Sequence, residues 1–146
     1  MRLTTKGRYG LKAMIELARN NSGEHTSIKS IAESEGISEN YLEQIFAVLK
    51  KAGLVQSMRG AQGGYVLGDD PDKITVGAVL RALEGSLAPV ECVMENEPTP
   101  CEKADECVTK IVWEKIRDRI NDVVDSLTLQ ELLDECSNKA ENSSIQ

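Results

Sequence analysis

Three amphipathic segments separated by glycines open the chain, and this pattern limits what the first part of the sequence can fold into. The segments end at Gly23, Gly36 and Gly53, and residues of N-cap type precede the second (Thr26 or Ser27) and the third (Ser38). Apolar residues recur three and four positions apart, at Leu11, Met14, Ile15 and Ala18, at Ile28, Ile31 and Ala32, and at Leu42, Ile45, Phe46 and Leu49. Such spacing predicts helices that each bury one face, here in the order of a helix-turn-helix.

A β-hairpin is predicted directly after the third helix. Short runs at 54–58 and 65–67 are typical of strands, and the link R-G-A-Q-G-G supplies glycines for a turn that needs positive φ. A helix-turn-helix followed by a hairpin is the order of a winged helix. We therefore predict a winged helix-turn-helix domain at residues 1–67. The alternative is an unrelated small helical domain that carries a hairpin.

Residues 68–136 are expected to form a second, helical part. A turn at 69–72 precedes a helix at 74–84, and a longer helix is predicted from about Ala104 to Ser126. Apolar residues of this longer helix are alternately three and four apart, at Trp113, Ile116, Ile120, Val123 and Leu127. This is the seam of a coiled coil, so we expect an antiparallel helix from a second subunit to cover it. The alternative is packing on the chain's own domain.

A last helix is predicted to begin at the capping box Thr128-Leu-Gln-Glu131. Cys136 falls on its apolar face and is expected to be a small core residue rather than a ligand. Residues 137–146 are polar and are expected to form a disordered tail. The predicted fold class is mainly α, with a winged helix-turn-helix domain, a small β-hairpin wing and a long dimerisation helix.

Three of the four cysteines, Cys92, Cys101 and Cys107, lie in one acidic loop with the spacing C-x8-C-x5-C. Negative surroundings raise the pKa of a thiol, so a thiolate here needs a strongly positive neighbour, and a metal is one. Zinc commonly binds C-x2-4-C pairs and a redox dithiol uses C-x-x-C, and the sequence has neither. The residues alone leave a cluster, zinc and free thiols open.

Charge and composition indicate where nucleic acid would bind. Residues 1–67 carry nine Lys and Arg against six Asp and Glu, whereas the rest carries eight against eighteen, so nucleic acid is expected to bind the first part.

No apolar run is long enough for a membrane span or a signal peptide, so a cytoplasmic protein with no membrane partner is expected. We do not expect an enzyme, because the chain has one histidine, His25, and no nucleophile–base set or phosphate-binding glycine loop.

The second helix of the helix-turn-helix is expected to enter the major groove of double-stranded DNA. Its polar side can bind cytosine N4 and adenine N6/N7, and its lysines, with Lys6, Arg8 and the N-terminal amides of the first helix, can bind phosphate. An arginine at the wing tip can enter the minor groove. The candidate DNA contacts are Lys6, Ser38, Asn40, Tyr41, Glu43, Gln44, Lys50, Lys51 and Arg59. A solvated polar face is the alternative.

Three stretches resemble the IscR-type winged-helix regulators, a family with IscR-like, NsrR-like and CymR-like branches. They are M-R-L-T-T-K-G-R-Y-G at the start, Y-L-E-Q at 41–44 and K-A-G-L-V-Q-S-M-R-G-A-Q-G-G-Y-V-L at 51–67. The resemblance covers about residues 1–135. It implies a homodimer with crossed long helices, and DNA contacts at Glu43, Gln44 and Arg59.

The resemblance also implies a cofactor. IscR-like and NsrR-like members use three cysteines to hold an iron–sulfur cluster, and Cys92, Cys101 and Cys107 match that trio, with 2Fe–2S expected over 4Fe–4S. The fourth ligand of IscR is a histidine three residues after the third cysteine; here that residue is Lys110, whose ammonium has no lone pair to give. The fourth ligand is unassigned, with Cys136, a carboxylate such as Glu106 or an exogenous group as candidates.

The predicted function is therefore transcription regulation by sequence-specific DNA binding that responds to an iron–sulfur cluster. A first alternative is a CymR-like repressor, which is controlled by a partner protein and has no cluster. An alternative of a different class is an iron–sulfur carrier or electron-transfer protein, which has no use for a recognition helix.

Overall fold

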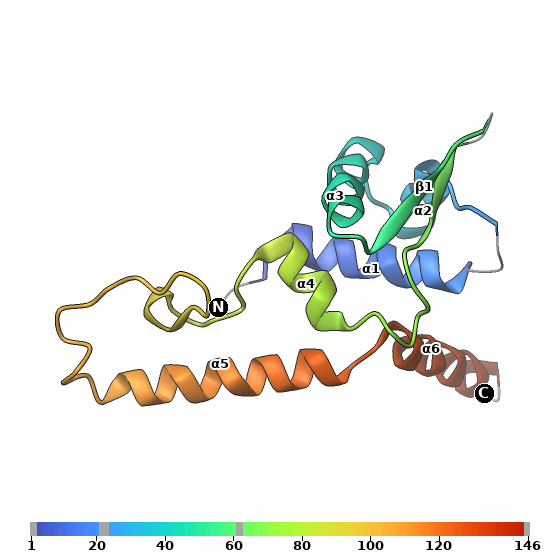
Figure 1. The fold of residues 1–146 in the computed structure, drawn as a ribbon. Coiled ribbons are helices and arrows are strands. Elements are labelled where there is room, and N and C mark those ends of the chain that lie inside the picture. The colour runs from blue at the N-terminus through green and yellow to red at the C-terminus, as the bar shows by residue number, and fades with distance from the viewer. Residues whose placement is uncertain (1–2, 21–23, 61–62, 145–146) are drawn as a thin grey trace.

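A computed structural model of the chain describes residues 3–20, 24–60 and 63–144. These residues form six α-helices and one hairpin: α1 (Thr5–Arg19), α2 (Ile28–Glu35), α3 (Glu39–Lys51), β1 (Val55–Met58), β2 (Gly64–Leu67), α4 (Val76–Glu84), α5 (Thr109–Ser126) and α6 (Leu129–Ser144), with a 3-10 turn η1 (Glu91–Val93) before α5. The predicted mainly α, winged-helix fold is confirmed (Figure 1). Gly23 and the middle of the wing turn, residues 61–62, lie outside the described residues.

Local capping and a buried stripe define the helix-turn-helix. The Ser27 and Ser38 hydroxyls accept hydrogen bonds from the backbone amides of Ser30 and Tyr41, each at 3.1 Å, so α2 and α3 both begin at a serine cap. Gly36 ends α2 with a left-handed φ of 66°, a conformation that favours glycine. The apolar stripe of α3 is fully buried in the core, at Leu42, Ile45, Phe46 and Leu49.

The wing is anchored at its base. β1 and β2 pair antiparallel, and β2 is joined to the start of α2 because Tyr65 and Thr26 exchange backbone hydrogen bonds of 2.8 and 2.9 Å. The Tyr65 ring also packs on Phe46 of α3, with 4.8 Å between the ring centroids. The hairpin is thus held against both helices of the helix-turn-helix.

The crossing of α1 and α4 depends on two glycines inside a helix. A Cβ at Gly7 would overlap the Glu84 carboxylate, and a Cβ at Gly10 would overlap the Leu83 side chain. Glycine in a helix interior costs roughly 0.5–1 kcal/mol relative to alanine. In α1 that cost accompanies space for the Glu84 and Leu83 side chains of α4, which a larger residue would displace.

Helix α5 lies along one side of the molecule, is attached through α4, and has an open outer face (Figure 1). Its C-terminal end is fixed by backbone bonds from the Val76 amide to the Leu127 carbonyl at 2.8 Å and from the Leu129 amide to the Ile74 carbonyl at 3.0 Å. No residue of α5 is buried, and four of its apolar side chains are between 38% and 58% exposed: Ile111, Val112, Ile116 and Val123.

Two segments differ from the sequence-based expectation. Helix α5 begins at Thr109 rather than near Ala104, because the preceding residues form short turns in which the Ala104 amide donates to the Cys101 carbonyl at 3.1 Å. Helix α6 continues to Ser144, through residues that were expected to be a disordered tail. No proline or glycine follows Cys136 to stop it.

Candidate nucleic-acid interface and cysteine loop

The side of α3 opposite its buried stripe carries most of the candidate DNA contacts. Hydrogen-bonding side chains lie along the first two turns, and two lysines follow in the last turn. This order suits a helix that reads base edges and binds the neighbouring phosphates. The exposed members of this reading face are Ser38, Asn40, Glu43, Gln44, Lys50 and Lys51.

Tyr41 differs from the other candidates on α3 because it is half-buried. Its hydroxyl lies 3.1 Å from Thr5 Oγ1, and its ring meets Tyr9 edge-on, with 6.0 Å between the centroids. Tyr41 therefore joins the start of α3 to the start of α1, a structural role that the sequence did not indicate.

Arg59 directly follows β1 and is exposed, and Arg8 is exposed on α1 while Lys6 is half-buried. Two amides at the N-terminus of α1, a position predicted to donate to phosphate, are occupied within the chain. The Glu84 carboxylate accepts hydrogen bonds from the Thr4 amide at 3.1 Å and the Gly7 amide at 2.9 Å. The positive side chains at this end of α1 remain candidates for phosphate, whereas those two amides are already satisfied.

The structure does not bring the three loop cysteines together. Cys92 lies half-buried in η1, Cys101 is exposed in a turn, and Cys107 is half-buried just before α5. Within the described ranges, no group of three His, Cys, Asp or Glu side chains is placed to hold a metal ion. Thiolates are suitable ligands for an iron–sulfur cluster, so the donor set fits this cofactor, but its arrangement in this conformation does not.

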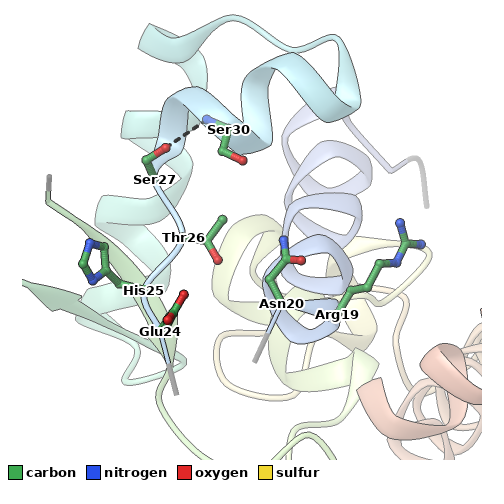
Figure 2. Close-up of a pocket in the computed structure, with 7 residues that line it drawn as sticks. All are labelled: Arg19, Asn20, Glu24, His25, Thr26, Ser27 and Ser30. Atoms are coloured by element: carbon green, nitrogen blue, oxygen red, sulfur yellow. Dashed lines mark hydrogen bonds between the residues drawn. The ribbon is translucent and has the colours of Figure 1, made fainter. Parts of the chain in front are cut away.

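Cys136, the candidate fourth ligand outside the loop, and His25, the one histidine of the sequence, both lie elsewhere in the fold. Cys136 is half-buried on α6, 3.6 Å from Arg19 Nη2, and α6 and the cysteine loop are at opposite ends of the molecule (Figure 1). His25 lines a polar hollow between α1 and α2, where Ser27 already caps α2 (Figure 2). Cys136 and His25 of the same chain are therefore not placed to complete a site with the trio.

The Cys107 thiol has its pKa lowered from the ordinary value. The main cause is the Thr109 hydroxyl, 3.1 Å from Sγ, and the backbone amides of Lys110 and Thr109 contribute. The acidic composition of the loop predicted a shift in the other direction. Hydrogen bonds at the start of α5 favour the thiolate and outweigh the desolvation that opposes it.

A polar network ties the first part of the cysteine loop to α4 and α5. Glu95 accepts hydrogen bonds from Asn121 Nδ2 at 2.9 Å and from Ser86 Oγ at 2.8 Å, and these contacts lower its pKa. Asn121 Oδ1 accepts from Arg81 at 2.8 Å, and Arg81 forms a two-bond ion pair with Asp125 at 2.7 and 2.9 Å. The loop next to Cys92 is therefore fixed to both helices. Sequence reasoning missed this network because its members are distant along the chain.

An anchored wing, an exposed reading face on α3 and a long helix with an open apolar face define a winged-helix transcriptional regulator. Residues 3–135 match the Rrf2 family, whose description is iron-dependent transcriptional regulator, and the chain belongs to this family. The predicted resemblance to IscR-type regulators is thereby confirmed.

Two named regulators illustrate the relationship. The chain is 49% identical over 132 residues to the HTH-type transcriptional regulator CymR of Bacillus subtilis (90% of this chain, 89% of that protein). It is 41% identical over 133 residues to the HTH-type transcriptional regulator IscR of Escherichia coli O1:K1 (91% and 80%). Both relatives are transcriptional regulators, not enzymes.

Solved structures show the same similarity to both branches. The structure of CymR, the global cysteine regulator of B. subtilis, matches with a TM-score of 0.76 at 49% identity and covers 92% of this chain and 98% of that one. T. potens IscR matches with a TM-score of 0.75 at 46% identity, with 93% and 88% covered.

No helix in the described part of the chain has the length and apolar character needed to cross a membrane.

Proposed function

We propose that the chain is a homodimeric regulator that binds promoter DNA in the bacterial cytoplasm, with α3 in the major groove and the wing arginine in the adjacent minor groove. The observation that carries this proposal is the exposed polar face of α3 beside a wing that is anchored to it. Glu43, Gln44 and Asn40 would read base edges, while Lys50, Lys51 and Lys6 would bind phosphates. Ser38 would combine its capping role with a backbone contact, and Tyr41 would position the start of α3.

The proposed dimer rests on α5. Its exposed apolar side chains form a stripe that the chain itself leaves uncovered, and an antiparallel copy of the same helix offers a complementary surface. Two reading heads would then contact two half-sites related by the symmetry of the dimer.

For the signal, we propose that Cys92, Cys101 and Cys107 hold an iron–sulfur cluster, 2Fe–2S rather than 4Fe–4S. Three thiol donors in one loop and the iron-dependent description of the family support this. A bound cluster would supply iron- and redox-dependent charge at the loop. Because Glu95 holds the loop near Cys92 in place, the residues around the exposed Cys101 would have to move to bring the thiols together.

A second candidate is a CymR-like repressor whose signal comes from a partner protein, without a cluster. Two observations favour it: the 49% identity to B. subtilis CymR, and the separation of the three thiols in this conformation. The third idea, an iron–sulfur carrier, leaves the reading face and the anchored wing without a purpose.

DNA binding is tested by selecting duplexes from a random-sequence pool with the anaerobically purified protein. Arg59→Ala should weaken binding of the recovered duplex and leave the melting temperature of the protein unchanged. Arg119→Ala on α5 should bind this duplex as the wild type does. Equal binding by the Arg59→Ala and Arg119→Ala proteins would remove the wing from the interface, and failure to enrich any sequence would contradict sequence-specific binding.

The cluster is tested by measuring iron, acid-labile sulfide and zinc per chain, with a visible spectrum of the same sample. Iron and sulfide in near-equal amounts, lost in Cys101→Ala while the protein stays folded, would support the three-cysteine site. Zinc alone, or no metal after anaerobic reconstitution with iron and sulfide, would favour the CymR-like candidate.

A further inference from the structure

Glu84, the last residue of α4, closes the N-terminus of α1. Its carboxylate accepts hydrogen bonds from the Thr4 amide at 3.1 Å, from the Gly7 amide at 2.9 Å, and from the Thr4 hydroxyl. A helix start leaves such amides without intrahelical partners. In a capping box the acid stands three residues after the N-cap, but here it comes from a helix 80 residues further along the chain.

The sequence of α1 accommodates this non-local cap. Thr4 is the N-cap residue of α1, but its side chain accepts no capping hydrogen bond, so Glu84 performs that function. Gly7 leaves room for it, because a Cβ at this position would overlap the carboxylate. The cap therefore depends on a glycine in α1 and an acid at the end of α4.

The capped turn also holds the groups that face DNA in the proposed function. Thr5 lies 3.1 Å from the Tyr41 hydroxyl at the start of α3, and Tyr9 packs on the Tyr41 ring. Lys6 and Arg8, two candidate phosphate contacts, are on the same two turns of α1. Displacement of this turn would shift those cations and loosen the start of the reading helix.

We propose that Glu84 is a positioning residue for DNA recognition. Without touching DNA, it fixes the first turn of α1 so that Lys6 and Arg8 meet phosphates while α3 is in the groove. This inference rests on the proposed DNA-binding function. A negative charge beside a DNA-binding surface would by itself lower the affinity for DNA. A positioning role explains why the Glu84 carboxylate is nevertheless there.

The test compares Glu84→Ala, Glu84→Gln and Gly7→Ala with the wild type, and Glu135→Ala on the exposed surface of α6 is the matched control. The probes are a duplex that the wild type enriches from a random pool and a scrambled duplex of equal length. Dissociation constants are measured over a range of salt concentrations, at a temperature well below the melting of each variant.

Glu84→Ala should bind the enriched duplex about tenfold more weakly, a loss comparable to that of a helix cap. Its plot of log affinity against log salt should be less steep by about one to two, because the two α1 cations no longer reach phosphates. Glu84→Gln keeps an acceptor oxygen and should lose about threefold or less. Gly7→Ala should show the same loss of affinity and the same change in salt slope as Glu84→Ala, although alanine favours the helix itself. Glu135→Ala should bind as the wild type does.

Three outcomes separate the explanations. Lower melting temperatures with unchanged affinity and salt slope would show that Glu84 only stabilises the fold, and would overturn the inference. Tighter binding by both Glu84 variants would show that its charge repels DNA, and would overturn it as well. A wild type that enriches no duplex would instead defeat the proposed function itself. If Glu84→Ala does not fold, Gly7→Ala and Glu84→Gln decide.

Discussion

Side chains on the reading face of α3 divide into groups suited to bases and groups suited to phosphates. Glu43 and Gln44 are exposed in the middle of the helix, where a groove-bound helix meets base edges, whereas Lys50 and Lys51 lie in its last turn. Sequence reasoning could assign this division because it depends only on helical periodicity and residue type. It could not assign the lowered pKa of Cys107, which depends on a hydroxyl and amides at the start of a helix predicted to begin elsewhere.

The two kinds of contact should respond differently to mutation. Gln44→Ala should cost about 1–3 kcal/mol of binding free energy on the enriched duplex and relax the preference at one base pair, without changing affinity for scrambled DNA. Lys51→Ala should weaken both duplexes to a similar extent and reduce the salt slope by about one. Competition with duplexes carrying single base-pair changes measures both effects. A uniform loss for Gln44→Ala would place its amide on the backbone instead.

At the scale of helices and strands, the sequence predicted helix starts correctly where a capping residue marks them. Ser27, Ser38 and the Thr128 hydroxyl, which accepts from the Glu131 amide at 3.2 Å, all cap helices as their motifs indicated. The predicted start of α5, near Ala104, was wrong because the spacing of apolar residues does not mark where a helix begins. Thr109 is preceded by a residue with no capping side chain and by a run of turns. The α1–α4 crossing was indicated in the sequence by Gly7 and Gly10, two glycines inside an amphipathic helix. Periodicity could not identify α4 as the helix that packs on them, because α4 lies far along the chain.

That crossing can be tested through Gly10. In Gly10→Ala the added methyl would overlap the end of the Leu83 side chain and also lie 3.4 Å from Ile45, so the buried Leu83 side chain must move. We expect a loss of about 1–3 kcal/mol in the free energy of unfolding, larger than the gain of about 1 kcal/mol from helix propensity. Urea unfolding measures the difference, and Lys12→Ala on the exposed side of α1 should change stability little. A more stable Gly10→Ala protein would show that the Leu83 side chain moves aside without cost.

The ion pair between α4 and α5 should make stability depend on pH. The hydrogen bonds from Arg81 lower the pKa of Asp125, so folding favours its charged form. This stabilisation is present above the unfolded-state pKa of about 3.9 and is lost as pH falls through the lower folded-state pKa. Because both partners are partly exposed, Asp125→Asn should cost only about 0.5–1 kcal/mol near neutral pH.

The measurement is the difference in free energy of unfolding between wild type and Asp125→Asn as a function of pH. The difference should be constant near neutral pH and should shrink in acid, while Asp122→Asn on the exposed side of α5 should show little difference at any pH. A gap that widens in acid would contradict the assigned direction of the Asp125 pKa.

At the scale of the whole molecule, the winged helix and the cysteine loop are joined through α4. One end of α4 caps α1 through Glu84, and Arg81 one turn earlier bonds to Asn121, which also holds Glu95 of the loop. The sequence indicated both regions and the long helix between the loop and α6, but not these links, because each is a contact between side chains of separate elements. Of the apolar seam predicted from spacing, Ile116 and Val123 are exposed in the single chain, as a dimer helix requires, whereas Ile120 and Leu127 pack on the core beside α4.

The dimer provides the last prediction. Ile116→Glu puts a charge in the middle of the exposed stripe of α5, where a partner helix would have to bury it without a counter-charge. The variant should sediment as a monomer whose circular dichroism matches the wild type, because Ile116 contributes little to the core of its own chain. Its affinity for a duplex with two half-sites should fall about 10²–10⁴-fold, since the second reading head is no longer held at high local concentration. Lys115→Glu on the neighbouring, exposed position should remain a dimer. A dimeric Ile116→Glu protein with unchanged DNA affinity would place the subunit interface on another surface and leave α5 as a helix exposed to solvent.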